Sequence, residues 1–284
     1  AGRLQALEEW PEAVDVLEAL LARRTGVQWG ETALDLARAS QWAGDDKGAI
    51  RAWRKVLEAD LAPDEARSAL DVLLRKGAQW SEWAENRRAQ IESATAETRL
   101  GLRAELAHIL GDELGERDDA LALWSEIARE VPAHLEAWRQ IASLEATADA
   151  RNAARWALVG QLTEGDPEWT ELLGILGNAA DVGRAIEALE LLREQDPESS
   201  TLLDALETRY EEADDWSNLV ALVESRLDGG DEDLGRLRRL ARYRSEGLTD
   251  LEGAGRAWAM LSARLPQDVS VARSLIENLE TRGD

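Results

Sequence analysis

The sequence predicts an all-α protein, an α-solenoid built from about eight tandem antiparallel helix pairs. Three observations lead to this fold class. Prolines recur along the chain at spacings of 69, 65 and 69 residues. Apolar residues follow a helical period, as in residues 182–195 and 200–210. Alternating β-branched runs and Asn-Gly hairpin turns, which are typical of strands, are missing from the sequence.

The repeat combines a small residue, a large apolar residue and a proline. An alanine stands 12 residues before three of the prolines and 14 before the other, and a Trp or Leu follows each alanine after four residues. The alanines are Ala49, Ala120, Ala185 and Ala254; the large residues are Trp53, Trp124, Leu189 and Trp258; the prolines are Pro63, Pro132, Pro197 and Pro266. We expect the alanine where two helices of a pair touch most closely, and the proline at the start of the next helix, where its missing N–H costs nothing.

A second tryptophan series interleaves with the first. Trp10, Trp80 and Trp216 each follow a short polar turn, and the first two are 70 residues apart. The unit is therefore about 35 residues, the length of a two-helix repeat. We expect each of these tryptophans to open a helix.

These patterns predict seventeen helices, which form about eight pairs with one helix left over. Their expected ranges are 3–8, 11–24, 28–43, 46–59, 63–76, 80–93, 95–114, 117–130, 134–147, 150–164, 167–178, 182–195, 198–212, 215–227, 231–246, 250–264 and 268–282. Aspartates in the turns suit helix N-caps, and Gly229 to Asp233 is expected to form one such turn. No stretch typical of a linker divides the chain, so we expect a single array over 1–284, a segment of a longer solenoid.

The sequence resembles the tetratricopeptide repeat family. The clearest unit is 166–199, where Trp169, Leu172, Leu176, Ala185, Leu189, Leu192 and Pro197 stand at that family's packing positions. Residues 200–233 are similar but lack the alanine and the proline, and Trp138, Ile141 and Ala142 resemble the family's opening motif. The resemblance implies a right-handed superhelix. A related half-a-tetratricopeptide family would imply a similar solenoid.

In the tetratricopeptide family the first helix of each pair lines a concave groove that binds peptides or partner helices. The resemblance therefore implies partner-binding residues on three first helices. They are Glu136, Arg139 and Ser143, then Thr170, then Asp204, Thr208 and Glu211. Trp83 and Trp156 lie off the clearest packing positions, so they are the candidates for an exposed binding hot spot.

The net charge of −24 restricts the partners. A chain with this negative charge repels phosphate backbones and anionic membrane surfaces. We therefore expect neither nucleic-acid binding nor membrane insertion. The charge suits a basic protein partner, but it also suits a solvated surface that keeps a long array soluble. Arginine outnumbers lysine thirty to three, which indicates a GC-rich bacterial genome.

Motifs for chemistry are missing from the sequence. There is no cysteine, and the two histidines, His108 and His134, are 26 residues apart with no metal-ligand spacing. His134 follows Pro132 at a helix start, where capping is its expected role, and His108 is expected to pack at an apolar edge. No glycine loop for phosphates and no nucleophile elbow occurs. We therefore expect neither catalysis nor a cofactor nor a metal.

The function that the sequence predicts is a protein-interaction scaffold. One alternative is an acidic decoy or chaperone for a basic protein, and another is a regulatory repeat domain of an enzyme whose catalytic part lies outside this chain. The last helix keeps Val271, Leu275, Ile276 and Leu279 with no later helix to cover them, which favours end-to-end packing with another chain. No signal peptide is recognisable, so we expect a cytoplasmic location.

Overall fold

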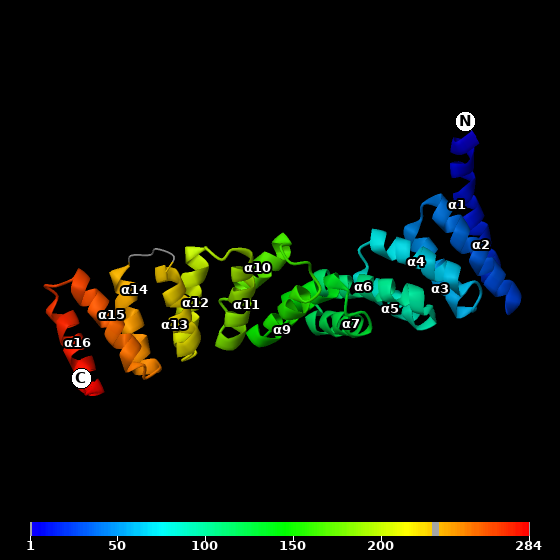
Figure 1. The fold of residues 1–284 in the computed structure, drawn as a ribbon. Coiled ribbons are helices and arrows are strands. Elements are labelled where there is room, and N and C mark those ends of the chain that lie inside the picture. Colours follow the sequence, from blue (N-terminus) through cyan, green and yellow to red (C-terminus); the bar gives the residue numbers. More distant parts are fainter. Residues whose placement is uncertain (1, 229–232, 284) are drawn as a thin grey trace. The chain divides into compact units, whose positions relative to one another are not determined.

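The computed structural model describes residues 2–228 and 233–283, with side chains from Trp10 onward, and this part of the chain contains helices and no strand (Figure 1). Its helices are α1 (Gly2–Leu21), α2 (Val27–Ala43), α3 (Asp46–Glu58), α4 (Pro63–Lys76), α5 (Trp80–Ser93), α6 (Ala96–Asp112), α7 (Arg117–Glu130), α8 (Leu135–Leu144), α9 (Ala148–Val159), α10 (Pro167–Leu176), α11 (Val182–Gln195), α12 (Ser200–Glu212), α13 (Trp216–Asp228), α14 (Leu234–Arg242), the π-helical turn η1 (Tyr243–Gly247), α15 (Leu251–Arg264) and α16 (Val269–Arg282).

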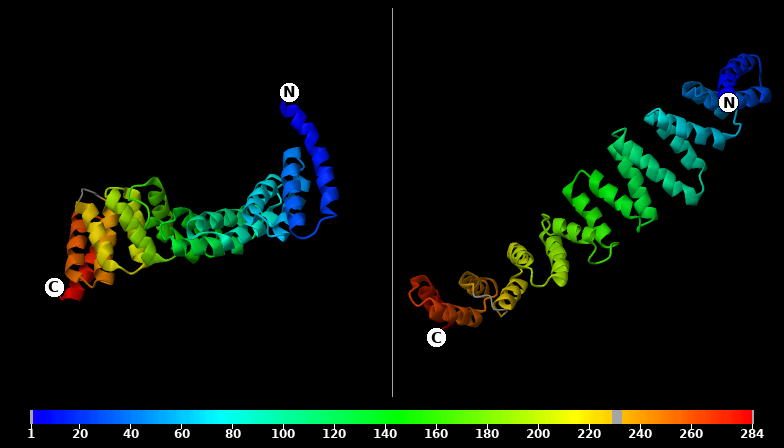
Figure 2. Two further views of the ribbon diagram at one scale, coloured as in Figure 1. Left: turned by 90° about the vertical axis from the view of Figure 1, so that its right-hand side faces the viewer. Right: turned by 90° about the horizontal axis from the view of Figure 1, so that it is seen from above.

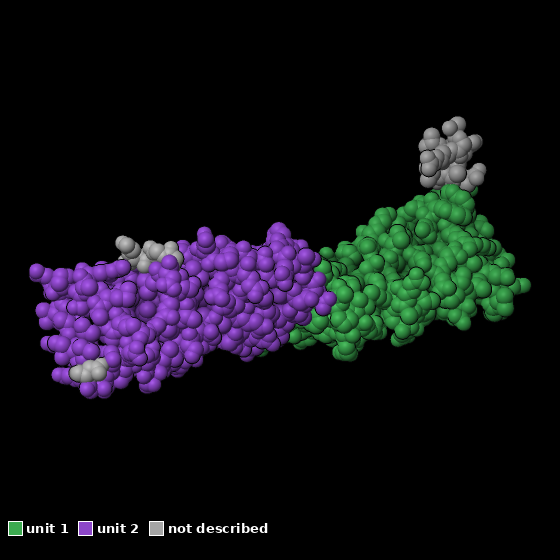
Figure 3. Space-filling model, viewed as in Figure 1, with its two compact units in different colours: residues 1–147 green, residues 148–284 purple. Residues whose placement is uncertain are grey.

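The helices form two compact units, residues 1–147 and 148–284 (Figure 3). Within each unit, consecutive helices pack against each other as antiparallel pairs, and the three ribbon views agree on this (Figures 1 and 2). We call α2, α4 and the following even-numbered helices the first helices, and α3, α5 and the following odd-numbered ones the second helices. The predicted fold class, an all-α array of tandem helix pairs, is confirmed. The single array over 1–284 and its right-handed course stay predictions.

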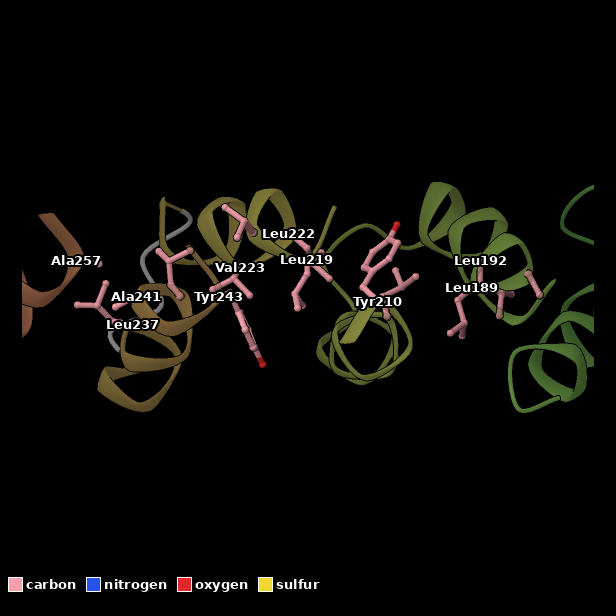
Figure 4. Packing of buried hydrophobic residues seen from close by; sticks show 14 of the residues in the cluster. Leu189, Leu192, Tyr210, Leu219, Leu222, Val223, Leu237, Ala241, Tyr243 and Ala257 are labelled. Carbon is pink, nitrogen blue, oxygen red and sulfur yellow. The ribbon is translucent and has the colours of Figure 1, made fainter. Parts of the chain in front are cut away.

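The repeated alanine and its large neighbour form the core of each pair, as predicted. All four alanines are fully buried. Trp53, Trp124 and Leu189 are buried one turn later, and Trp258 is half-buried against the core of the second unit. In Figure 4, Leu189 and Leu192 of α11, Tyr210 of α12 and Leu219, Leu222 and Val223 of α13 follow one another through this core. Contact between small and large side chains therefore holds successive helices together.

The prolines act mainly as helix terminators. Pro63 opens α4 as predicted, but Pro132, Pro197 and Pro266 lie three residues before the next helix. For these three the predicted helix start is wrong. In each turn, the missing N–H and fixed φ of proline stop the preceding second helix.

The N-terminal prediction is wrong as well. Two helices, 3–8 and 11–24, were expected around Pro11, and Trp10 was expected to open the second. The structure has one helix, α1, with Pro11 inside it. Val14 and Leu17 pack on the core of the first unit and Leu21 is buried in it, while the ring of Trp10 lies 4.7 Å from that of Trp42. This tertiary contact outweighs the hydrogen bond that Pro11 removes.

The helix predicted over 231–246 begins in residues outside the described part of the chain. Residues 229–232 of the predicted turn also lie outside the described residues. Asp233, the last residue of that turn, caps α14. After Arg242 the helix widens into η1. Gly247, at its end, lies against the indole of Trp216, and a β-carbon at Gly247 would collide with that ring. The close contact between α13 and η1 therefore needs glycine at this position.

Aspartates cap several helices and contribute to the net charge. The carboxylates of Asp45, Asp166, Asp181, Asp233, Asp250 and Asp268 each accept a backbone N–H at a helix start. In the second unit the helices carry 16 acidic and 15 basic residues, whereas its other residues carry 13 acidic and none basic. The helices of that unit are thus nearly neutral, and the acidic excess lies in its other residues, five of which cap helix N-termini: Asp166, Asp181, Asp233, Asp250 and Asp268.

Candidate interaction surfaces

A groove opens between two first helices of the first unit. Its volume is about 410 Å³, and the floor is the buried indole of Trp53. The other residues that line it come from α2 and α4: Arg38, Gln41, Trp42, Glu65, Ser68 and Ala69. We call these seven residues the Trp42 groove. Gln41 closes one end, since its Oε1 accepts a hydrogen bond from Trp53 Nε1 at 3.2 Å.

Trp42 is the most exposed tryptophan of the described residues, with 57% of its surface accessible. Its ring is supported by Trp10, so the indole is held in place although it is open to solvent. Val72, one turn beyond Ala69 on α4, is also exposed. A fixed, exposed aromatic ring beside a cavity is the usual form of a binding hot spot. No sequence pattern indicates Trp42 as a binding residue, because its surroundings depend on the packing of α1 and α4.

A two-pronged ion pair crosses the Trp42 groove. Arg38 donates from Nε to Glu65 Oε1 at 2.9 Å and from Nη2 to Glu65 Oε2 at 2.8 Å. The hydrogen bond from Arg38 lowers the pKa of Glu65, and the same bond raises the pKa of Arg38. The two charges neutralise each other, so the groove presents a polar but uncharged wall.

The predicted groove residues of α12 have different surroundings. Asp204 Oδ1 lies 2.7 Å from Arg226 Nη1 and 3.2 Å from Arg236 Nη2, so its carboxylate already forms ion pairs within the chain. Glu211 likewise pairs with Arg242 at 3.1 Å and accepts from the Tyr243 hydroxyl at 3.2 Å. Thr208 is exposed, and its hydroxyl donates to the carbonyl of Asp204 one turn earlier.

Between these residues lies Glu207, which the sequence did not identify. Only 7% of Glu207 is exposed. Its carboxylate lies 3.0 Å from Arg239 Nε, 3.4 Å from Arg226 Nη1 and 3.5 Å from Arg236 Nε. We call Asp204, Glu207, Glu211 and the arginines Arg226, Arg236, Arg239 and Arg242 the α12–α14 ion cluster. It joins two consecutive first helices through charge where an open groove was expected.

The predicted residues of α8 and α10 are more accessible. Arg139 and Ser143 are exposed and Glu136 is half-buried, where its carboxylate accepts from Gln140 at 2.9 Å and lies 3.9 Å from His108. Thr170 is exposed at the start of α10. These four residues stay candidates for partner contact.

One of the two tryptophan predictions is wrong. Trp83 is fully buried, with the guanidinium groups of Arg75 and Arg87 5.2 and 4.6 Å from its ring. Arg87 in turn pairs with Asp71 at 2.5 Å and with Glu105 at 2.9 Å, so Trp83 is the apolar centre of a charged contact between helices. Trp83 does not stand at one of the repeat's packing positions, so the repeat pattern did not predict its burial. It is buried in another way, beneath two guanidinium groups. Trp156 is half-buried and lines a cavity.

A second kind of groove repeats between consecutive second helices. Cavities of about 420, 620 and 300 Å³ lie between α3 and α5, α11 and α13, and α13 and α15. In all three, the ninth residue of the earlier second helix lines the wall: Arg54, Glu190 and Glu224. The cavity at Trp156, the ninth residue of α9, belongs to the same series.

Both histidines have the structural roles expected of them. His134 Nδ1 accepts the N–H of Ala137 at 3.1 Å and caps α8. The ring of His108 meets Trp124 edge-on with centroids 4.9 Å apart. Within the residues that the structure describes, no three acidic or histidine side chains gather in a way that could hold a metal ion.

The last helix corrects one further expectation. Val271 is fully buried, because it turns inward onto the core of the second unit. Leu275 and Leu279 are half-buried. Ile276 and Val269 are the exposed apolar residues of α16, at 55% and 72%.

Comparison with known proteins gives only structural matches. No family model matches the sequence, and no curated protein matches it. The solved structures include a chain from the structure of Naa15/Naa10 bound to HypK-THB, with 13% identity over 98% of this chain and 44% of that chain and a TM-score of 0.45. They also include a tetratricopeptide repeat protein from Parabacteroides merdae ATCC 43184, with 12% identity over 89% and 99% of the chains and a TM-score of 0.37. A thermophilic TPR protein from Thermus thermophilus is 15% identical over 76% and 98%, with a TM-score of 0.28.

The class of protein is therefore defined by the helix pairs themselves: an all-α array of tandem antiparallel helix pairs. This chain spans less than half of the first matched chain. No described helix has both the length and the apolar character needed to cross a bilayer. The cytoplasmic location stays a prediction.

Proposed function

We propose that this chain is a non-catalytic protein-binding scaffold and that the Trp42 groove receives an apolar side chain of its partner. The observation that carries the proposal is the exposure of Trp42 above a cavity while Trp10 holds its ring. An aromatic residue that is already ordered loses little conformational entropy on binding. The neutral pair of Arg38 and Glu65 supplies a polar rim.

The candidates on α8 and α10 extend this proposal to further first helices. In the first unit, Glu136, Arg139 and Ser143 are accessible to a partner, and in the second unit Thr170 is accessible in the same way. Asp204 and Glu211 contribute less, because an incoming group would have to displace an arginine of the α12–α14 ion cluster.

The net charge of −24 favours a basic partner through long-range attraction. A decoy that works by charge alone would need an acidic binding face. In the second unit, however, the helices are nearly neutral, and the excess acidity lies between them. We therefore prefer a partner that is attracted by charge and retained by an apolar contact. A regulatory role beside a catalytic partner is compatible with the same groove.

End-to-end association is a separate part of the proposal. Val269 and Ile276 lie seven residues apart on α16 and so point to the same side of that helix. They would form the contact with a further helix, on the same chain or on another one.

The test is an affinity pull-down from lysate of the source organism at low and at high salt, with bound proteins identified by mass spectrometry. It uses wild type, Trp42→Ala and, as a matched control, Met260→Ala, which removes a side chain of similar exposure (52%) from α15. We expect one or a few proteins to survive high salt with wild type and Met260→Ala and to be lost with Trp42→Ala. Retention by Trp42→Ala would refute the groove, and release of every bound protein by salt would favour the decoy.

A further inference from the structure

Three positions repeat around the second-helix cavities of the second unit. The ninth residue of the second helix is Trp156, Glu190 or Glu224, at intervals of 34 residues. The eleventh residue counted from the start of the intervening first helix is Gly177, Tyr210 or Arg244. The aspartate directly before the next second helix is Asp181, Asp215 or Asp250.

In the two later repeats the chain fills this position with its own side chain. The guanidinium of Arg244 pairs with Glu224 and lies 3.5 Å from the carboxylate of Asp250. Gly253 leaves it room, because a β-carbon there would collide with the guanidinium. Tyr210 takes the same place one repeat earlier, where its hydroxyl donates to Glu190.

The repeat between α9 and α11 lacks such a side chain. Gly177 stands at the position, and a β-carbon there would come within 2.8 Å of the side chain of Leu189, which would have to shift. What remains is a cavity of about 280 Å³, whose polar lining is Asp149, Asn152, Trp156, Asp181 and Arg184. Of the cavities of this series in the described part of the chain, it is the one to which the first helix contributes no long polar side chain.

The polar groups of this cavity differ in their partners, and Asn152 Oδ1 accepts a hydrogen bond from Arg155 Nη1 at 2.8 Å. Within the described part of the chain, Trp156 Nε1 is buried and has no hydrogen-bond acceptor. Asp181 accepts only its capping N–H from Arg184 at 3.1 Å. The guanidinium of Arg184 lies 5.3 Å from the centre of the Trp156 ring but pairs with Glu187 at 2.8 Å, and its side chain is 54% exposed. Arg184 therefore lines the cavity but pairs with Glu187 and with neither Asp149 nor Asp181.

We infer that this cavity receives an arginine side chain of a partner protein, in the place that Arg244 takes two repeats later. Its guanidinium lies beside Asp181, as that of Arg244 lies beside Asp250, and its stem lies along Trp156. Asp149 adds a second carboxylate, so the lining has more acidic than basic groups and is complementary to a cation.

This site lies in the second unit and does not depend on the Trp42 groove. The proposal for the Trp42 groove and the inference of this arginine site can therefore be refuted independently. Trp42→Ala is expected to leave arginine binding unchanged.

The experiment is an NMR titration of the whole chain, followed at the indole N–H of Trp156, which is assigned by its loss in Trp156→Phe. The probe is N-acetylarginine methylamide, and the control ligand is the citrulline analogue, which has nearly the same shape and no charge. Asp181→Asn keeps a residue that can cap α11 and removes only the charge. Glu194→Gln, an exposed change on the same helix outside the cavity, removes an equal charge.

We expect the arginine probe to shift the Trp156 resonance and the citrulline analogue to bind at least about fivefold more weakly. Asp181→Asn should weaken arginine binding about fivefold and Glu194→Gln less than about twofold. If Asp181→Asn lowers the thermal stability so far that it does not fold, Asp149→Asn takes its place. No shift with arginine, equal binding of both ligands, or equal losses in the two charge variants would overturn the inference.

Discussion

Glu207 Oε1 accepts a hydrogen bond from Arg239 Nε across 3.0 Å, which joins residues 32 positions apart on α12 and α14. Arg226 of α13 and Arg236 of α14 lie against the same carboxylate, at 3.4 and 3.5 Å. One nearly buried acid thus contacts three arginines from two different helices. The contact between these two first helices depends on charge matching as well as on apolar packing.

Glu207→Ala is expected to destabilise the chain by about 3 kcal/mol, because it leaves partly buried arginines without their shared counter-ion. Urea unfolding monitored by circular dichroism measures the change. Glu212→Ala is the control: its partner is Arg209, three residues away on the same helix, and the loss of this exposed pair should cost at most about 0.5 kcal/mol. Equal effects of the two variants would mean that the ion cluster does not stabilise the fold.

Gly247→Ala should destabilise the chain by about 1–3 kcal/mol, because the new methyl group collides with Trp216. Gly174→Ala is the matched control within α10, where a β-carbon meets nothing within 4 Å. That change should stabilise by about 0.5–1 kcal/mol, since alanine favours a helix interior more than glycine does. Thermal unfolding should therefore show midpoints that move in opposite directions, and a loss in both variants would contradict the open space at Gly174.

Ala185→Leu is expected to cost about 1–3 kcal/mol by overpacking, because Ala185 is fully buried where α10 and α11 meet. Ala259→Leu places the same side chain on an exposed position of α15 and should change stability by less than about 0.5 kcal/mol. Chemical denaturation compares the two. An unchanged unfolding midpoint for Ala185→Leu would show that the proposed close contact is absent.

Asp268 gives the chain a pH-dependent contribution to stability. The hydroxyl of Ser270 and then the guanidinium of Arg238 lower its pKa to about 2, from an ordinary value of about 3.9. Because the unfolded chain binds the proton more readily, this contribution is complete above about pH 4 and is lost as the pH falls toward 2. Asp268→Asn should therefore be less stable than wild type near pH 6, with a difference that shrinks near pH 2.5. A constant difference in the thermal midpoint would contradict the lowered pKa.

The sequence was sufficient for the helices because their signals are local. Aspartate caps, apolar periodicity and turn residues lie within a few positions of each helix end, and α4, α5, α7 and α11 have the predicted bounds. The two N-terminal helices are the exception. There Pro11 predicted a break, and the contact of Trp10 with Trp42 decided for one continuous helix.

Which tryptophan is buried could not be predicted in the same way. Trp83 and Trp42 both lie off the repeat's packing positions, yet Trp83 is fully buried and Trp42 is 57% exposed. Trp83 packs in the hydrophobic core of the first unit, and the guanidinium groups of Arg75 and Arg87 lie over its ring. No spacing rule encodes that choice, because it depends on which charged side chains the neighbouring helices bring to the ring.

By itself the sequence determined the fold class, the repeat of about 35 residues and the alanine contacts, since each follows from short-range periodicity and side-chain size. Only the tertiary structure decided that Asp204 and Glu211 are neutralised by arginines of later helices, that Trp42 stands above a groove, and that the cavity between α9 and α11 receives no long polar side chain where Tyr210 and Arg244 line the later ones. These features join residues of separate helices, and their energies depend on distances that arise only when the helices pack.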